Sequence, residues 1–258
     1  MQNMKQIISI MLLLAAAAAV WGQTCGDKRG AMNYFDSVSG VDTAAVDRFI
    51  DLLATLDPDE AVRAAGNASR ALAGQEHSLK LLLDSGGRAF YDMESPRYDE
   101  EVFLAMVIPA LESGNLDADY TETLRYFRDQ MMMNRRGTVA ADFEVTLADG
   151  SLTSLRRLLK EDGLTVIFYD PECDVCHTVM DRMASAGERN VMAVAFLAED
   201  DGWKRDAGRY PSGWTFCRPV ADVEEIYSIP HVPTLYRLDG EGRVEWKKPD
   251  FGIVTKKH

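Results

Sequence analysis

Cysteine, histidine and positive charge are scarce in this chain of 258 residues, which contains four cysteines and four histidines. Four cysteines are far too few for a scaffold stabilised by disulfide bonds at this length, so each cysteine needs its own explanation. Lysine and arginine number 28 against 41 acidic residues, a formal net charge of −13. Because so acidic a protein repels phosphate backbones, we expect no nucleic-acid partner.

The chain also lacks an apolar run long enough to cross a bilayer. Its one extended run covers residues 7–20, about 14 residues, whereas a spanning helix needs about 20. Lys5 precedes this run and small residues surround its end near Gly22, which is typical of a secretory signal peptide. We therefore expect residues 1–22 to be removed and the protein to reach the periplasm or cell envelope.

Export places cysteines in an oxidising compartment, where thiols are either paired or catalytic. Cys25 follows the expected cleavage point, but Thr24 and Gly22 occupy places where a lipid-attachment box has a small and an aliphatic residue. Lipid anchoring at Cys25 is therefore not expected.

Cys217 stands alone in the sequence, and we expect a half-buried free thiol there, with a disulfide to Cys25 as the alternative.

The first half of the mature chain predicts an all-α domain over residues 23–134, because its apolar residues recur at helical spacing. The expected helix starts are Asp42 or Thr43, Asp57–Pro58, Gln75, Ser95–Pro96 and Tyr120. We expect Gly86–Gly87 to stop the third helix and Pro109 to end or kink the fourth.

The pattern changes after Asn134 to one that predicts an α/β domain over residues 135–258. Alternating apolar residues around Asp149–Gly150 predict a hairpin, followed by a short helix over 151–160. The later expected elements are buried strands over 164–169 and 191–197, a helix over 176–186 between them, an inserted loop and helix over 199–216, and a last hairpin of 235–238 with 244–246.

Two cysteines, Cys173 and Cys176, lie where a predicted strand ends and a predicted helix begins. At positions i and i+3 of a first helical turn, two sulfurs can bond without a backbone rearrangement. The helix N-terminus carries partial positive charge, which stabilises a thiolate on the first cysteine. We therefore expect Cys173 to attack a partner disulfide and Cys176 to resolve the mixed disulfide.

A family resemblance supports this interpretation of the cysteine pair. The segments that carry it are Gly137, Ala141–Phe143, Asp149–Gly150, Leu152, Val166–Cys176, Val232–Tyr236 and Asp239–Gly242. In these segments residues 135–248 resemble the thioredoxin-like thiol–disulfide oxidoreductases of the TlpA and ResA type. The resemblance implies a thioredoxin-like fold, a cis Pro233 stacked against the cysteine pair, and substrate binding by Val232, Pro233 and Thr234.

The same resemblance implies protein thiols and disulfides as partners, a membrane electron donor of the DsbD kind, and no cofactor. Two segments of the first half, Tyr91–Arg97 and Asn134–Gly137, resemble the helical domain of unknown function that precedes thioredoxin-like domains in bacterial envelope proteins.

The chain departs from the thioredoxin pattern at two positions. Glu172 replaces the usual tryptophan before the first cysteine, and Ile167 replaces a buried acid that helps to deprotonate the second. The proton acceptor is therefore open between Asp170 and Glu172. Because Glu172 and Asp174 place negative charge beside the nucleophile and oppose thiolate formation, we expect a protein-disulfide reductase or isomerase and not a strong oxidant.

Three alternatives follow from the same residues. His177 completes Cys-x-x-Cys-His, the attachment signature of c-type haem in electron-transfer proteins. Zinc binding by Cys173, Cys176, His177 and Cys217 fits by ligand type, but adjacent Cys and His make tetrahedral closure awkward, so no metal is expected. In the third alternative the helical domain binds a partner and the redox domain is accessory.

Overall fold

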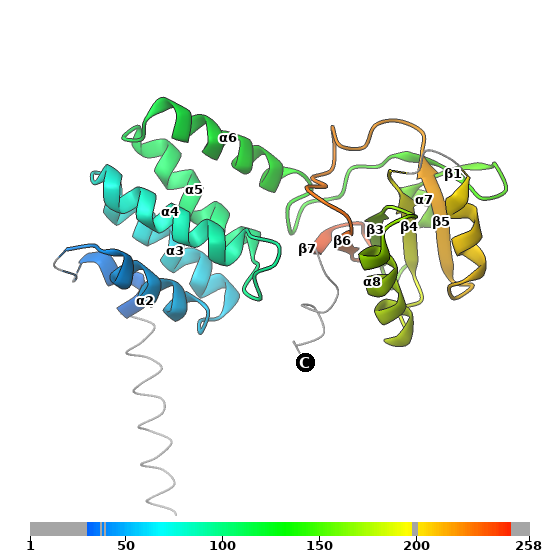
Figure 1. The fold of residues 1–258 in the computed structure, drawn as a ribbon, viewed down its shortest axis with the longest axis horizontal. Helices are drawn as coiled ribbons and strands as arrows, with labels where there is room; N and C mark the ends of the chain where they lie inside the picture. Colours follow the sequence, from blue (N-terminus) through cyan, green and yellow to red (C-terminus); the bar gives the residue numbers. More distant parts are fainter. Residues whose placement is uncertain (1–29, 37, 39, 198–200, 249–258) are drawn as a thin grey trace, which may run out of the picture. The chain divides into compact units, whose positions relative to one another are not determined.

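The computed structural model describes residues 30–36, 38, 40–197 and 201–248 (Figure 1). These ranges leave out the expected signal peptide over 1–22, Cys25 and residues 250–258. The chain forms two compact units, divided between Arg128 and Asp129. The sequence predicted a boundary after Asn134.

Among the described residues, no helix has the length and apolar character needed to cross a membrane.

The N-terminal unit is entirely helical in its described part. Its elements are a 3-10 turn (Tyr34–Asp36), α2 (Thr43–Leu53), α3 (Pro58–Leu72), α4 (Glu76–Phe90), α5 (Glu100–Ser113) and most of α6 (Ala118–Met132), which crosses the division at Arg128 (Figure 1). Asp42 caps α2, where its carboxylate accepts the N–H of Ala45 at 2.8 Å. The buried Ser69 hydroxyl of α3 donates to the Met106 carbonyl of α5 at 2.7 Å, which fixes these two helices against each other.

The predicted stop at Gly86–Gly87 is wrong, because α4 continues through both glycines to Phe90. These glycines permit close packing of α4 on α5: a Cβ on Gly86 would lie 2.5 Å from the Met106 sulfur. Glycine here serves helix contact, a role that outweighs its low helix propensity.

The predicted start of the next helix at Ser95–Pro96 is also wrong, and Pro109 does not end that helix. Ser95 lies in a turn, where its hydroxyl donates to the Ala89 carbonyl at 2.6 Å. Helix α5 instead begins after Asp99, whose carboxylate accepts the N–H of Glu101 at 3.2 Å. Pro109 lies inside α5, which continues to Ser113 and ends at Gly114 with φ of 67°.

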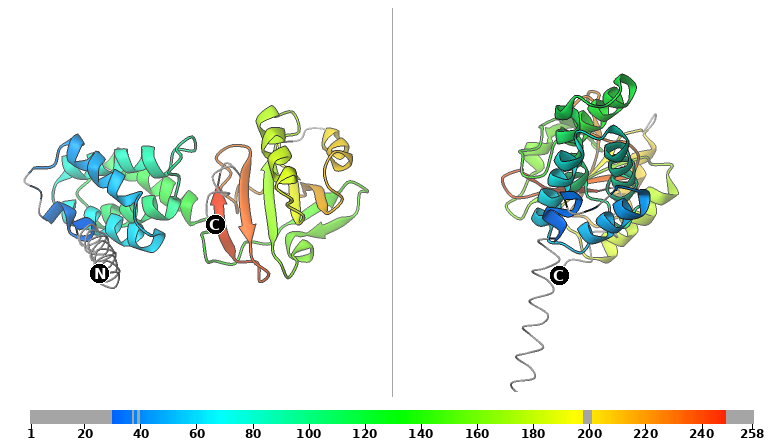
Figure 2. Two further views of the ribbon diagram at one scale, coloured as in Figure 1. Left: turned by 90° about the horizontal axis from the view of Figure 1, so that it is seen from below. Right: turned by 90° about the vertical axis from the view of Figure 1, so that its left-hand side faces the viewer.

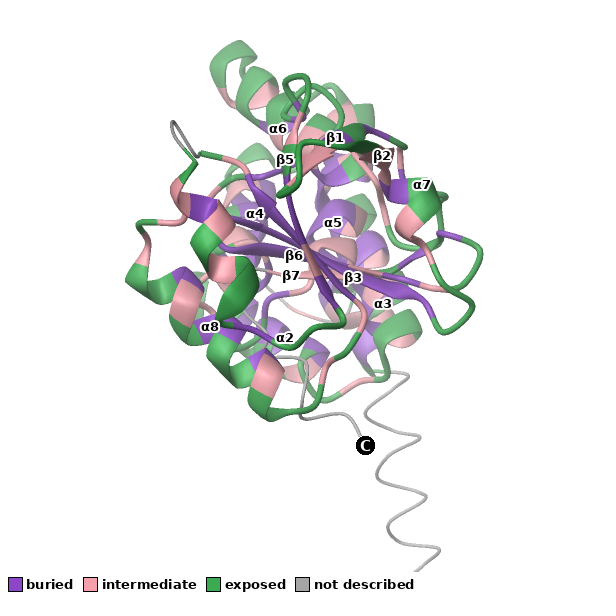
Figure 3. Ribbon diagram, turned by 90° about the vertical axis from the view of Figure 1, so that its right-hand side faces the viewer, coloured by how far each residue is buried: buried purple, intermediate pink, exposed green. Residues whose placement is uncertain are grey.

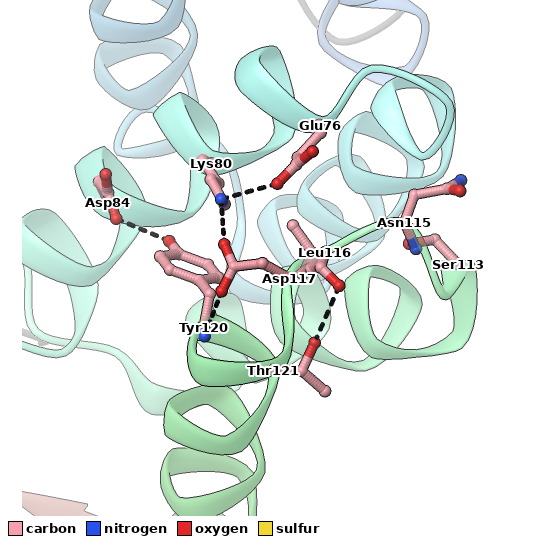
Figure 4. A network of polar contacts seen from close by, with 9 residues as sticks. All are labelled: Glu76, Lys80, Asp84, Ser113, Asn115, Leu116, Asp117, Tyr120 and Thr121. Carbon is pink, nitrogen blue, oxygen red and sulfur yellow. Dashed lines mark hydrogen bonds and ion pairs between the residues drawn. The ribbon is translucent and has the colours of Figure 1, made fainter.

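A polar network joins α4 to the start of α6 (Figure 4). The Lys80 ammonium bonds to Glu76 at 2.8 Å and also to Asp117, and these bonds raise the pKa of Lys80, the Asp117 bond contributing most. The Tyr120 hydroxyl donates to Asp84 at 2.6 Å. The contacts tie the start of α6 to α4 without a buried ion pair.

The C-terminal unit is a mixed sheet with helices. Its elements are β1 (Glu144–Leu147), β2 (Leu152–Ser154), α7 (Leu155–Leu158), β3 (Leu164–Tyr169), α8 (Asp174–Ser185), β4 (Val191–Ala195), a 3-10 helix (Gly202–Gly208), β5 (Trp214–Pro219), β6 (Thr234–Leu238) and β7 (Val244–Lys248). The described strands form one seven-stranded sheet in the order β2-β1-β5-β4-β3-β6-β7. Strand β4 is parallel to β3 and β5, and the other neighbours are antiparallel. Strands β6 and β7 end the sheet, orange and red in Figure 2.

Three sequence predictions in this unit need correction. Residues 151–160 contain the strand β2 before the helix α7, which is only four residues long. Strand β4 ends at Ala195, two residues short of its predicted end. The segment 199–216 contains the start of β5, in which Trp214 and Phe216 are buried in one apolar cluster and Thr215 between them is partly exposed.

Strand β3 is buried along its whole length (Figure 3). Val166 and Phe168 belong to one apolar cluster, whereas Ile167 and Tyr169 belong to another that includes the inner side of α8. Because successive strand residues point to opposite faces, the two clusters lie on opposite faces of the sheet. The C-terminal end of β3, which leads to the cysteine pair, is therefore fixed from both sides.

Gly163 provides a test of this packing. It has φ of +84°, and a Cβ there would lie 2.2 Å from the Leu238 carbonyl oxygen of β6. Gly187 has nearly the same φ, +83°, but open space around it. We expect Gly163→Ala to lower the free energy of unfolding by about 1–3 kcal/mol more than Gly187→Ala, because only the former forces a backbone shift.

The measurement is urea unfolding followed by tryptophan fluorescence. Beyond the expected signal peptide, all tryptophans (Trp203, Trp214 and Trp246) lie in the C-terminal unit, so the signal reports on that unit. Equal losses in the two variants would contradict the close approach of Gly163 to β6.

Candidate active site

The turn between β3 and α8 carries Cys173. The Asp170 carboxylate accepts the N–H of Glu172 at 2.9 Å, and the Cys173 N–H donates to the Asp170 carbonyl at 3.1 Å. This pattern is an Asx turn, which aspartate favours because its short side chain reaches the backbone two residues on. Helix α8 begins directly afterwards, at Asp174, and so two residues earlier than predicted.

Cys173 occupies the N-cap position of α8, with its sulfur 3.2 Å from the Cys176 backbone nitrogen, whose N–H it accepts. Cys173 is partly exposed, whereas Cys176 is fully buried. Both are free thiols in this structure. An incoming sulfur can therefore reach Cys173 first, while Cys176 lies behind it on the same helical turn.

Burial raises the pKa of the Cys176 thiol, and a side-chain hydrogen bond with Cys173 acts in the same direction. Asp170 acts in both directions: a hydrogen bond from its backbone favours the Cys176 thiolate, and the charge of its carboxylate, a smaller effect, opposes it. Cys176 is therefore protonated at neutral pH and must lose its proton before it attacks a mixed disulfide.

The two acids proposed for proton transfer differ in their surroundings. Asp170 is half-buried, and its charge acts on Cys176. Glu172 is exposed, beside Asp174 and Val175, which are also exposed. Of the two predicted groups, Asp170 has the closer electrostatic relation to the buried thiol.

The segment Val232–Thr234 lies next to the cysteine turn. Antiparallel pairing places Thr234 of β6 opposite Phe168 of β3, so the residues before Thr234 lie alongside the residues after Phe168. The Val232–Pro233 peptide bond is cis, as the family resemblance implied. Val232 packs against the same apolar cluster as Cys173.

The Thr234 side chain is directed into the fold. It is buried, and the hydroxyl donates to the His231 carbonyl at 2.7 Å. Thr234 therefore shapes the loop internally, and of the three predicted substrate-binding residues only Val232 is partly exposed.

His177 is held at both ring nitrogens. Its Nε2 lies 2.8 Å from the Pro171 carbonyl oxygen and its Nδ1 lies 3.0 Å from the Tyr210 hydroxyl. A haem iron would require one of these nitrogens to leave its partner. The structure therefore gives His177 a role within the fold that does not involve haem.

The proposed zinc ligands are not brought together. Cys217 belongs to the cluster on the opposite face of the sheet from Cys176. Across the described ranges, no three His, Cys, Asp or Glu side chains are grouped so that they could hold a metal ion.

Cys217 is free, as predicted, but it is fully buried where the sequence suggested a half-buried thiol. Its sulfur lies 3.6 Å from the Ala193 carbonyl oxygen, and burial raises the pKa of its thiol. The error follows from the missed strand β5, which carries Cys217 into the core.

An aromatic group near the cysteine turn was not predicted. Tyr210 stacks on Trp214 with ring centroids 5.1 Å apart and planes at 4°, and Phe216 lies beside both. The Tyr169 hydroxyl donates to Asp206 at 3.0 Å. The spacing of rings at 210, 214 and 216 was the available signal, but the segment was interpreted as a loop.

The N-terminal unit contains a separate cavity of about 390 Å³ between α4, α5 and α6. Three rings line it: Tyr91 stacks on Phe103 with centroids 5.4 Å apart and contacts Phe127 at 5.2 Å. Arg88 and Asp84 lie at its margin among the lining residues. This cavity gives the partner-binding alternative a location.

Comparison with solved structures relates most of the chain to a known fold. A thioredoxin-like protein from Bacteroides caccae is similar, with a TM-score of 0.74 and 20% sequence identity over 90% of this chain and 93% of that one. The thioredoxin domain of a thiol–disulfide oxidoreductase from Bacteroides vulgatus is 22% identical over 46% of this chain and 91% of that one, with a TM-score of 0.40. The sequence matches no protein-family profile and no curated protein.

The similarity to the Bacteroides caccae protein extends over both units. It confirms the predicted fold class, an α/β thioredoxin-like fold preceded by an all-α region. At 20% identity the comparison establishes the fold alone, so activity must be argued from the site.

The cysteine environments predict selective alkylation. In folded, reduced protein at about pH 8, we expect iodoacetamide to modify Cys173 at least about tenfold faster than Cys176 or Cys217, because burial raises the pKa of the latter two and blocks access to them. Peptide mass spectrometry after timed quenching measures the rates. In denaturing urea the three should react alike. Rapid labelling of Cys217 in the folded protein would contradict its burial.

Proposed function

We propose that this chain is a protein-disulfide reductase of the cell envelope, a thioredoxin-like thiol–disulfide oxidoreductase similar to the TlpA and ResA type. The observation that carries the proposal is the arrangement of the two thiols. Cys173 is partly exposed at the N-terminus of α8 and accepts the Cys176 N–H, while Cys176 is buried one turn behind it. This arrangement suits an attacking thiol and a resolving thiol.

The reaction has two exchange steps. The Cys173 thiolate attacks one sulfur of a substrate disulfide, and the other substrate sulfur leaves as a thiolate that takes up a proton. The Cys176 thiol then loses its proton and attacks the Cys173 sulfur, which releases the second substrate thiol. Two electrons pass to the substrate, and the Cys173–Cys176 pair becomes a disulfide.

Asp170 is the better candidate for the proton acceptor in the second step. Its charge already acts on the Cys176 thiol, whereas Glu172 is exposed. A carboxylate beside a buried thiol stabilises the protonated form until the proton is transferred to it.

The loop at Val232–Pro233 is the proposed substrate contact. Val232 is partly exposed and packs against the cluster that includes Cys173. An extended substrate segment that pairs with the Val232 backbone would present its disulfide to the Cys173 sulfur.

The charges near Cys173 favour the reducing direction. The exposed side chains that flank it, Glu172 and Asp174, carry negative charge. A strong oxidant needs the opposite, a reduced form stabilised by an acidic first thiol. Continuous turnover then requires an electron donor for the resulting disulfide, and a membrane donor of the DsbD kind would supply it.

Substitution of the cysteines tests the chemistry. The assay is the reduction of insulin disulfides by this protein, with dithiothreitol as the electron donor. We expect Cys173→Ser to abolish this activity, because the attacking sulfur is lost. Cys176→Ala should accumulate a mixed disulfide on Cys173, identified by non-reducing electrophoresis and mass spectrometry. Cys217→Ala, which alters the buried thiol on the other sheet face, serves as the control with turnover retained. Undiminished turnover in Cys173→Ser would refute the proposal.

Removal of the two carboxylates beside Cys173 should change the reduction potential of the cysteine pair. We expect the double substitution Glu172→Gln/Asp174→Asn to raise the potential of the cysteine pair by about 10–20 mV, because an exposed charge contributes up to about 1 kcal/mol and about 30 mV corresponds to a tenfold equilibrium change. Equilibration with glutathione buffers gives the potential. Glu161→Gln removes an exposed charge at the far end of β3 and should leave it unchanged. A fall in potential in the double variant would contradict this reasoning.

A further inference from the structure

His177, the residue after the resolving cysteine, is bonded to the cysteine turn at two points. Its backbone N–H donates to the Cys173 carbonyl at 3.2 Å. Its ring Nε2 lies 2.8 Å from the Pro171 carbonyl oxygen. Because a carbonyl oxygen only accepts, Nε2 carries the hydrogen and donates it. The side-chain bond therefore joins the first turn of α8 to the segment that precedes Cys173.

Tyr210 holds the other side of the ring. Its hydroxyl lies 3.0 Å from His177 Nδ1, and its ring is fixed by stacking on Trp214. The Trp214 indole N–H in turn donates to the Glu188 carbonyl at 2.8 Å. This chain of contacts anchors the histidine to β5 through Tyr210, which lies between the 3-10 helix and that strand.

Charged groups surround the Tyr210 hydroxyl. The Arg209 guanidinium lies over the Tyr210 ring at 5.3 Å and pairs with Asp181 of α8 at 3.0 Å. Burial, and then the charge of Asp181, raise the pKa of Tyr210, so its hydroxyl stays protonated. The Tyr169 ring packs edge-on against His177 and bonds to Asp206.

We propose that His177 is a positioning residue for thiol exchange at Cys173: it acts through the Pro171 carbonyl, and Tyr210 orients it. This inference rests on the proposed function and deepens it. The Asp170–Cys173 turn must hold the Cys173 sulfur where it accepts the Cys176 N–H and where an incoming sulfur can align with it. The His177 bond to Pro171 restrains that turn in addition to the bond that the Asp170 carboxylate accepts from Glu172.

Two substitutions of similar size separate this role from simple packing. In His177→Gln the side-chain amide nitrogen reaches the position of Nε2 and can still donate to Pro171. In His177→Asn the amide reaches only the position of Nδ1, near Tyr210. We expect His177→Asn to lower kcat/KM for insulin disulfides by about 3- to 10-fold, the effect of losing one hydrogen bond, and His177→Gln to stay within about twofold of the wild type.

A second measurement does not depend on turnover. The pH profile for alkylation of Cys173 should shift to higher pH in His177→Asn, because a loosened turn weakens the N–H bond that stabilises the sulfur anion. His177→Gln should keep the wild-type profile. Tyr210→Phe, which keeps the ring and removes the hydroxyl, should shift it in the same direction by less. His77→Asn, at an exposed histidine of α4, is the matched control without a shift.

Equal impairment of the Gln and Asn variants would assign His177 a packing role alone and overturn the inference, as would a wild-type profile in His177→Asn. The proposed function fails separately: it would fail if the wild type reduced no disulfide. In that event the alkylation profiles would still decide whether His177 positions the Cys173 sulfur.

Discussion

The burial of β3 on both faces is the constraint on which the cysteine site depends. Val166 and Phe168 contact one cluster while Ile167 and Tyr169 contact the other, so the strand can neither slide nor rotate without exposing one set. The turn that follows is consequently delivered to a fixed place at the edge of the sheet. The pairing of β3 with β6 brings Pro233 to the same edge, so two segments remote in sequence become neighbours.

The electrostatics of the site are a balance of opposed effects. The N-terminus of α8 and the Cys176 N–H favour negative charge on the Cys173 sulfur. Exposed carboxylates at Glu172 and Asp174 oppose it, but water screens them. At Cys176 a backbone hydrogen bond from Asp170 favours the thiolate, but burial and the hydrogen bond with Cys173 outweigh it and raise the pKa of the thiol. The two thiols therefore differ strongly in their exposure and in their electrostatic surroundings, although they lie three residues apart.

Much of this unit could be predicted from the sequence because its signals are local. The run Leu164–Tyr169 has no charged residue, so its burial and bounds were evident, and the cysteine pair lies directly after it. The errors arise where tertiary contacts decide. Gly86 continues a helix because Met106 packs against it, a contact 20 positions away that no local pattern encodes. The partners of His177 could not be predicted for the same reason, because Tyr210 is held by stacking on Trp214 of β5, and the start of this strand lay in the segment interpreted as an inserted loop and helix.

The position of Cys217 has a consequence for how the protein matures. A thiol that forms no pair is a hazard beside two that exchange disulfides, because three sulfurs within reach allow wrong pairings. The sheet separates Cys217 from Cys176 by placing them on opposite faces. Folding thus acts as a barrier against wrong pairing among these three sulfurs: once β5 has joined β4, Cys217 is buried and withdrawn from exchange with the other two.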